Sequence, residues 1–204
     1  MTQVEVVVLA NSVKHSQHCV AGKCVQTGKW IRPVSNAQGA ELSHDQAKYQ
    51  NPYGVYAVKP LQKIRMVFSS HVPLSHQPEN FLIDGNRWTQ NFSIGSGDLH
   101  HYLDDPDDLW GNGNRVQHAL ISLGMYTVAQ SLYLVQVDSL VLYTTGEGKR
   151  KASFTYKGID YELSVTDPKF DEIVRNKSEV LGILCISLGE EFQGYCYKLV
   201  ATIF

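Results

Sequence analysis

Residues 153–165, Ser-Phe-Thr-Tyr-Lys-Gly-Ile-Asp-Tyr-Glu-Leu-Ser-Val, contain two short β-rich runs on either side of Lys157-Gly158. A glycine between such runs indicates a tight hairpin, because glycine adopts the positive φ that the turn needs. The stretch therefore predicts two adjacent antiparallel strands, at residues 153–156 and 159–165.

Three further strand-like runs lie on either side of this hairpin, at residues 131–143, 180–188 and 195–204. They are rich in leucine, valine, isoleucine and tyrosine, which favour strands. Together with the hairpin they make about five strands, the number that an OB-fold barrel uses.

The beginning of the chain has a similar pattern. Its strand-like runs are residues 4–9, 18–25, 29–34, 53–58 and 63–72. Several short strands with turn signals between them predict a small barrel or sandwich, and argue against a parallel α/β sheet. We therefore expect a mainly β protein with two tandem OB-like five-stranded barrels, at residues 1–75 and 128–204.

Residues 76–127 differ in character and are predicted to form an acidic, partly helical connector. Ser96-Gly97-Asp98 can cap a short helix that continues to Leu103. Residues 115–123 carry apolar side chains at helical spacing and are followed by Gly124. This spacing favours a second short helix, although a strand is the alternative there.

The composition excludes several classes of protein. The chain has 204 residues, 43% of them hydrophobic, and a formal net charge of −2, which fits a packed core and not a disordered chain. No apolar run approaches the roughly 18 residues that would span a bilayer, and no secretory signal is visible. Four cysteines do not make a disulfide scaffold in a chain of this length. We expect a cytoplasmic protein without a membrane partner.

The charges are distributed unevenly along the chain. Residues 1–75 carry a net charge of +5, residues 76–127 carry −5, and the remainder carries −2. A basic segment is typical of a surface that binds a polyanion, since phosphate neutralisation dominates non-specific nucleic-acid affinity. The alternative is that the basic and acidic segments neutralise each other within the fold.

Several blocks of sequence, in order, resemble a known family. They are Leu9-Ala10-Asn11-Ser12-Val13-Lys14-His15, Gly28-Lys29-Trp30-Ile31-Arg32-Pro33-Val34-Ser35, Leu103-Asp104-Asp105-Pro106-Asp107-Asp108-Leu109-Trp110, and Phe154-Thr155-Tyr156-Lys157-Gly158. Over nearly the whole chain, the sequence is similar to the prokaryotic dual OB-containing domain family. The resemblance implies two OB barrels in tandem and carries no catalytic residue across. Nucleic-acid binding follows only by analogy with other OB-folds.

The strongest binding candidate is a cluster of cations and aromatic rings in the first predicted barrel. Its members are Lys14, His15, Lys23, Lys29, Trp30 and Arg32. Single-strand binders combine cations that contact phosphates with aromatic rings on which bases stack. Side chains alternate along a strand, so an inward Ile31 would place Trp30 and Arg32 outside. The alternative is that Trp30 fills or covers the barrel and Arg32 pairs with an acidic residue of the connector.

Two other groups of residues offer chemistry. His15, His18, Cys19 and Cys24 contain zinc-type ligands, but their spacing is not a usual zinc pattern, and buried thiols are common. We predict no metal and no cofactor. His76 could act as a general base if Glu79 oriented it, whereas a polar loop that satisfies backbone groups is the alternative.

No phosphate-binding Walker loop, nucleophile elbow or zinc-protease motif occurs in the sequence. The sequence therefore favours a non-enzymatic binding module for single-stranded DNA or RNA that uses the first barrel. A protein–protein or small-ligand adaptor in a prokaryotic, for example defence-related, system is the second interpretation. An enzyme that uses His76 and Glu79 is the third.

Overall fold

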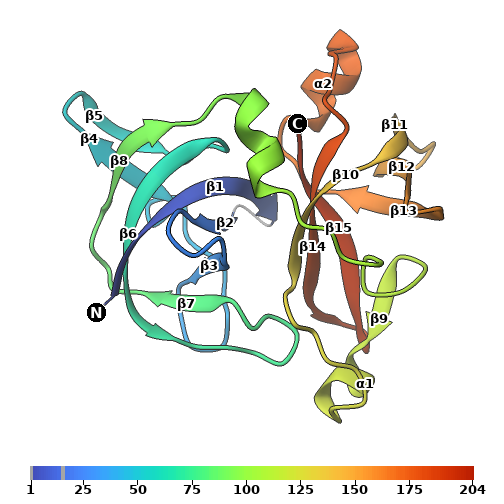
Figure 1. Cartoon of the computed structure of the whole chain (residues 1–204), viewed down its shortest axis with the longest axis horizontal. Helices are drawn as coiled ribbons and strands as arrows, with labels where there is room; N and C mark the ends of the chain where they lie inside the picture. Colours follow the sequence, from blue (N-terminus) through green and yellow to red (C-terminus); the bar gives the residue numbers. More distant parts are fainter. Residues whose placement is uncertain (1, 15–16) are drawn as a thin grey trace. The chain divides into compact units, whose positions relative to one another are not determined.

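The computed structural model describes residues 2–14 and 17–204, which form two compact units, the first ending at Tyr102 and the second beginning at Leu103 (Figure 1). Both units are built mainly of β-strands, so the predicted fold class is confirmed. The segment expected as a separate connector, residues 76–127, is divided between the two units.

The first unit contains eight strands and a 3₁₀ helix within its described residues. These are β1 (Thr2–Lys14), β2 (Gln17–Cys24), β3 (Trp30–Val34), β4 (Lys48–Asn51), β5 (Gly54–Ala57), β6 (Gln62–His71), β7 (Asn80–Ile83), β8 (Trp88–Ser93) and η1 (Ser96–Tyr102). The helix η1 occupies the position where the sequence predicts a short capped helix.

Five of these strands close into a barrel. β1 pairs with β2, β2 with β3, β3 with β7, β7 with β6, and β6 returns to β1. The β3–β7 pair is parallel, and the other four pairs are antiparallel. The closing strand β7 lies beyond residue 75, where the sequence analysis places the end of the first barrel.

The remaining strands extend the sheet away from the barrel. β8 pairs with β6, β4 pairs with β8, and β5 pairs with β4, so β5 is the last strand of the sheet. The segment between β3 and β6 supplies the β4–β5 hairpin, visible as a protruding pair of strands in Figure 1.

The first barrel is filled by alternating side chains of its strands. Ile64, Met66 and Phe68 of β6 point into a core that also holds Trp88. β1 and β2 approach each other closely near an irregularity in their pairing, and a Cβ atom on Gly22 would lie 2.1 Å from the carbonyl oxygen of Val7. A glycine is therefore needed at this position.

The second unit contains seven strands and two short α-helices. These are β9 (Arg115–Gln117), α1 (His118–Ser122), β10 (Leu132–Gln136), β11 (Asp138–Thr144), β12 (Arg150–Tyr156), β13 (Ile159–Val165), α2 (Phe170–Asn176), β14 (Ile183–Phe192) and β15 (Tyr195–Ile203). The predicted hairpin at Lys157-Gly158 joins β12 to β13. Where the sequence leaves helix and strand open, at residues 115–123, the structure has β9 followed by α1.

The second barrel repeats the connectivity of the first. Its strands follow the order β10-β14-β15-β13-β12-β11, and β13 and β15 form the parallel pair. The two ends of this order, β10 and β11, are separated in the chain only by Val137, so the chain itself completes the ring. β9 pairs with β15 outside this order.

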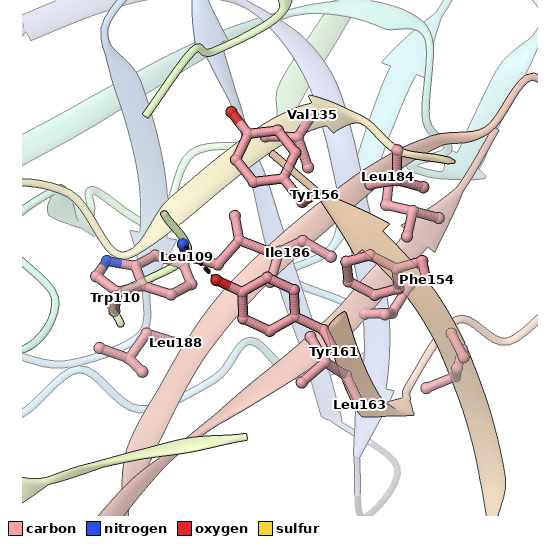
Figure 2. Packing of buried hydrophobic residues seen from close by; sticks show 14 of the residues in the cluster. Leu109, Trp110, Val135, Phe154, Tyr156, Tyr161, Leu163, Leu184, Ile186 and Leu188 are labelled. Carbon is pink, nitrogen blue, oxygen red and sulfur yellow. Dashed lines mark hydrogen bonds between the residues drawn. The ribbon is translucent and has the colours of Figure 1, made fainter. Parts of the chain in front are cut away.

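The core of the second barrel is aromatic and aliphatic (Figure 2). The rings of Phe154 and Tyr161 stack with their centroids 5.7 Å apart. The backbone N–H of Leu109 donates to the Tyr161 hydroxyl at 3.2 Å, the dashed line in Figure 2. Leu109 and Trp110 thus anchor the acidic segment that precedes β9 to this core.

A lysine is buried beside this core. Lys198 is 1% exposed, and its ammonium donates to the backbone carbonyl oxygens of Gly111, Asn112 and Gly113. The same ammonium lies 5.2 Å from the centre of the Tyr161 ring. Burial lowers the pKa of Lys198 to about 8, while the nearby carboxylate of Asp108 opposes this change.

Candidate functional site

The strand that the sequence analysis selects as the binding strand, β3, is covered on both sides. Ile31 belongs to the barrel core, as the alternation predicts. The expectation that Trp30 and Arg32 lie exposed on the opposite side is wrong, because they are only 5% and 7% exposed. An indole with so little free surface cannot offer its face to a base.

Trp30 and its neighbour Lys23 make contacts within the first unit. Lys23 lies opposite Trp30 in the β2–β3 pair, and its ammonium is 5.3 Å from the centre of a Trp30 ring. The same ammonium donates to the backbone carbonyl of Tyr102 at 2.7 Å, at the end of η1. This buried cation therefore stabilises the packing of η1.

Arg32 forms a buried ion pair with Glu79. A guanidinium nitrogen lies 3.5 Å from a carboxylate oxygen, and the Arg32 backbone N–H donates to the Glu79 carbonyl at 2.9 Å. This is the pairing that the alternative interpretation of Arg32 describes. The same ion pair involves the Glu79 carboxylate, which the enzymatic interpretation needs in order to orient His76.

The other predicted site residues lie apart from this buried cluster. Lys29 is exposed in the turn before β3. His15 and the side chain of Lys14 fall outside the described residues. Lys29 is thus the one member of the predicted set that the described structure presents to solvent.

Three of the four possible metal ligands, His18, Cys19 and Cys24, are among the described residues. Within the described part of the chain, no group of three or more His, Cys, Asp or Glu side chains could hold a metal ion. His18 Nε2 lies 3.2 Å from His44 Nδ1, and His18 Nδ1 lies 2.9 Å from the side-chain oxygen of Asn11. Burial, and secondarily the neighbouring His44, lowers the pKa of His18.

A different surface of the first unit combines cations with an exposed aromatic ring. Lys63 and Arg65 alternate along β6 with the core residues Ile64 and Met66, so the two cations share the outer side of the strand. On β8, Phe92 lies opposite Lys63 and Thr89 lies opposite Arg65. We call these four residues, Lys63, Arg65, Thr89 and Phe92, the β6–β8 face.

The charges of the β6–β8 face are available to a ligand. Among the described residues, neither Lys63 nor Arg65 has a carboxylate oxygen within 4.0 Å. Glu5 of β1 lies opposite Arg65, and its carboxylate accepts a hydrogen bond from the Asn91 side chain at 2.6 Å. Phe92 is 66% exposed beside these cations.

The β4–β5 hairpin continues this surface. Gln50 of β4 lies opposite Thr89, and Val55 of β5 lies opposite Gln50. Tyr53, in the turn between β4 and β5, is 87% exposed. Within residues 2–14 and 17–204, the extended sheet and its β4–β5 turn therefore offer two exposed aromatic rings and two cations without a carboxylate partner.

The sequence contained a signal for this face. Lys63-Ile64-Arg65-Met66 alternates between charged and apolar residues, which is typical of a strand with one solvated face. The signal was missed because the partner strand β8, with Phe92, falls in the segment expected to be a connector.

Two OB-like barrels in one chain define a dual OB-fold protein, and OB barrels serve as binding modules for oligomeric ligands. The chain belongs to the family described as Dual OB-containing domain, whose model matches residues 4–203. The family resemblance noted in the sequence is thus confirmed.

Comparison with other proteins adds little to this assignment. No curated protein matches the chain in sequence. Among solved structures, the crystal structure of the tetrameric p202 HIN2 is similar over 98% of this chain and 88% of that chain, with 10% identity and a TM-score of 0.32. A likeness at this TM-score carries no argument about function. No helix in the described part of the chain is long and apolar enough to cross a membrane.

Proposed function

We propose that this dual OB-fold protein binds single-stranded nucleic acid through the β6–β8 face of its first barrel. The observation that carries the proposal is the placement of Lys63 and Arg65, without carboxylate partners among the described residues, beside the exposed ring of Phe92. This face takes the role that the sequence analysis gave to Trp30 and Arg32. The exposed Lys29 stays in the proposal as a further phosphate contact.

The arrangement fits the chemistry of a single strand. Phosphates bind to the two cations, while an unpaired base stacks on Phe92, a contact that contributes about 1–3 kcal/mol in single-strand binders. A duplex hides the faces of its bases, so it would gain only the phosphate contacts. We therefore expect single strands to bind more tightly than a duplex of the same length.

The charge of the first unit supports the same conclusion. Residues 1–102 contain nine basic and six acidic residues, and residues 103–204 contain nine basic and fourteen acidic residues. The first unit is thus positive by three charges and the second negative by five. A polyanion is attracted to the first unit.

The proposal is tested by fluorescence anisotropy with a fluorescein-labelled oligodeoxythymidylate of about 15 nucleotides, within the site sizes of single-strand binders. An RNA of the same length and a duplex are measured alongside it. Phe92→Ala should weaken single-strand binding roughly tenfold, because the stacking surface is lost. Lys63→Gln combined with Arg65→Gln should reduce the salt dependence by about 1.4 in log–log slope, at about 0.7 per phosphate contact.

The control removes the same charge elsewhere. Lys169→Gln combined with Arg175→Gln deletes two cations from the second unit, so binding by the β6–β8 face should be nearly unchanged. Absence of oligonucleotide binding at low salt, where electrostatic attraction is strongest, would contradict the proposal. Equal losses in the two double variants would contradict the assignment to this face.

The adaptor interpretation is favoured by the apolar surface next to the same face. Val55 and Tyr53 are exposed on the β4–β5 hairpin, and β5 is an edge strand. A protein partner bound through these side chains would depend little on Lys63 and Arg65. Retention of a partner by the Lys63→Gln/Arg65→Gln protein, together with no oligonucleotide binding by the wild type, would support the adaptor.

A further inference from the structure

The second unit carries a separate group of exposed aromatic side chains around one arginine. β9, the end of β14 and the start of β15 form a three-stranded antiparallel ribbon. Arg115 lies opposite Tyr197, and Phe192 lies opposite Tyr195. We call these four residues, Arg115, Phe192, Tyr195 and Tyr197, the Arg115 ribbon.

The alternation along the ribbon places these side chains on its outer surface. Val116 follows Arg115 on β9 and lies opposite Cys196, which stands between Tyr195 and Tyr197 on β15. Both Val116 and Cys196 are buried in the core of the second barrel. Arg115 is exposed, Phe192 is 58% exposed, and the two tyrosines are half-buried. The ribbon thus presents one cation and three rings to the solvent.

The guanidinium of Arg115 is held in place by its neighbours. Its Cζ atom lies 4.0 Å from the centre of the Tyr195 ring and 5.8 Å from that of Tyr197. Its Nη1 donates to the Tyr197 hydroxyl at 3.2 Å. A guanidinium stacked on an aromatic ring keeps donors free at its edge, and an oxyanion can bind them in a bidentate manner.

The charges around the ribbon leave this guanidinium available. Among the described residues, Arg115 has no carboxylate oxygen within 4.0 Å. Glu190 and Glu191 lie on the same hairpin as Phe192, and Glu191 accepts a hydrogen bond from the Gly194 backbone N–H. By contrast, Lys149, Lys151 and Lys157 of the second unit each form an ion pair.

We propose that the Arg115 ribbon is a second nucleotide subsite, in which Arg115 binds a phosphate and Phe192 stacks on the adjoining base. A nucleotide combines the two chemical groups that the ribbon accommodates, an oxyanion and a flat ring. The inference rests on the proposed function, since it assigns the same class of ligand to a second site. The negative charge of the second unit makes this subsite weaker than the β6–β8 face.

Two measurements separate the subsites. The first is UV cross-linking of an oligonucleotide that contains 5-bromodeoxyuridine, followed by peptide mapping. We expect cross-links in a peptide that contains Phe92 and in a peptide that contains Phe192. The second is anisotropy with oligodeoxythymidylate in the Lys63→Gln/Arg65→Gln protein, in which binding at the β6–β8 face is weakened and the ribbon supplies a larger share of the signal.

Variants of the ribbon should act on the second subsite alone. Arg115→Ala and Phe192→Ala should each lower the cross-link yield at the ribbon roughly tenfold and leave cross-links at Phe92 intact. Phe192→Tyr keeps an aromatic face and should retain the yield. Arg175→Ala removes a cation that is exposed on α2 and serves as the matched control for Arg115→Ala.

The outcomes distinguish the two proposals. Cross-links confined to the Phe92 peptide would overturn the second subsite and leave the proposed function standing. No cross-links and no binding at low salt would overturn both. Protection of the ribbon from tyrosine iodination by an acidic peptide, but not by oligodeoxythymidylate, would assign the ribbon to a protein ligand and overturn the inference.

Discussion

The two barrels share one connectivity and differ in how they use their basic residues. Each closes through a parallel pair, β3–β7 in the first and β13–β15 in the second. The first leaves Lys63 and Arg65 unpaired among the described residues and buries Arg32 against Glu79. The second pairs Arg150 and Lys151 of β12 with carboxylates and buries Lys198 among backbone carbonyls. The difference teaches that one barrel topology can carry outer surfaces of different charge, and these are the surfaces that a ligand would meet.

The segments inserted between corresponding strands differ as well. Between β3 and β6 the first barrel contains the β4–β5 hairpin, whereas between β13 and β14 the second contains α2. The hairpin lengthens the sheet beside β8 and so builds the broad outer surface around Phe92. A helix in that position adds no strand to the sheet.

The largest expected effect tests whether each barrel depends on its own core. Phe154→Ala in the second barrel and Phe68→Ala in the first should each lower the free energy of unfolding by about 3–5 kcal/mol, since both side chains are almost completely buried. Hydrogen exchange read by mass spectrometry should show lost protection in the altered barrel. Equal loss in both barrels from one substitution would contradict the view that the two cores are separate.

A slightly smaller effect tests the buried ion pair of the first barrel. Glu79→Ala leaves the Arg32 guanidinium buried without its carboxylate and should cost about 3 kcal/mol of unfolding free energy, measured by urea denaturation. At temperatures where the variant remains folded, its affinity for oligonucleotide should match that of the wild type. A large loss of affinity in the folded variant would return Arg32 to the binding site.

The smallest effect concerns Lys198 of the second barrel, whose ammonium is buried among three backbone carbonyls. The folded-state pKa of about 8 lies below the unfolded value of about 10.4, so the unfolded chain binds more protons between these values. The wild type should therefore gain roughly 1 kcal/mol of stability relative to Lys198→Met as the pH rises from about 8 to about 9.5. Below about pH 7, where Lys198 is protonated in both the folded and the unfolded state, the difference should be constant.

Urea denaturation of both proteins across this pH range measures that difference. Other titrating groups, such as Cys196 with its pKa raised to about 11 by burial, contribute to both proteins and cancel. A difference that falls as the pH rises would show that the buried ammonium is favoured over the neutral amine.

The sequence predicts the positions of the strands better than it predicts which sides of the strands are covered by other parts of the chain. Alternation correctly places Ile31 inside and assigns Trp30 and Arg32 to the other side of β3. It cannot show that the other side is covered, because coverage depends on residues distant in sequence, such as Tyr102 and Glu79. Likewise β7, only four residues long, gives too short a pattern to distinguish a barrel strand from a polar connector.

Only part of the candidate site can be predicted from the sequence, because alternation along one strand does not show which strand lies beside it. Lys63 and Arg65 belong to a clear alternating strand and to the basic segment of the sequence. Phe92 follows polar residues, and only the pairing of β8 with β6 brings it opposite Lys63. A cross-strand neighbour is set by register, which a single sequence does not specify.

The burial of every indole in the chain has a practical consequence. Trp30 and Trp88 lie in the first unit and Trp110 lies in the second, and each is at most 5% exposed. Their intrinsic emission should shift when a barrel melts and stay nearly constant when an oligonucleotide docks on the surface. Replacing Trp110 with phenylalanine would then give a spectroscopic reporter that follows the melting of the first barrel alone.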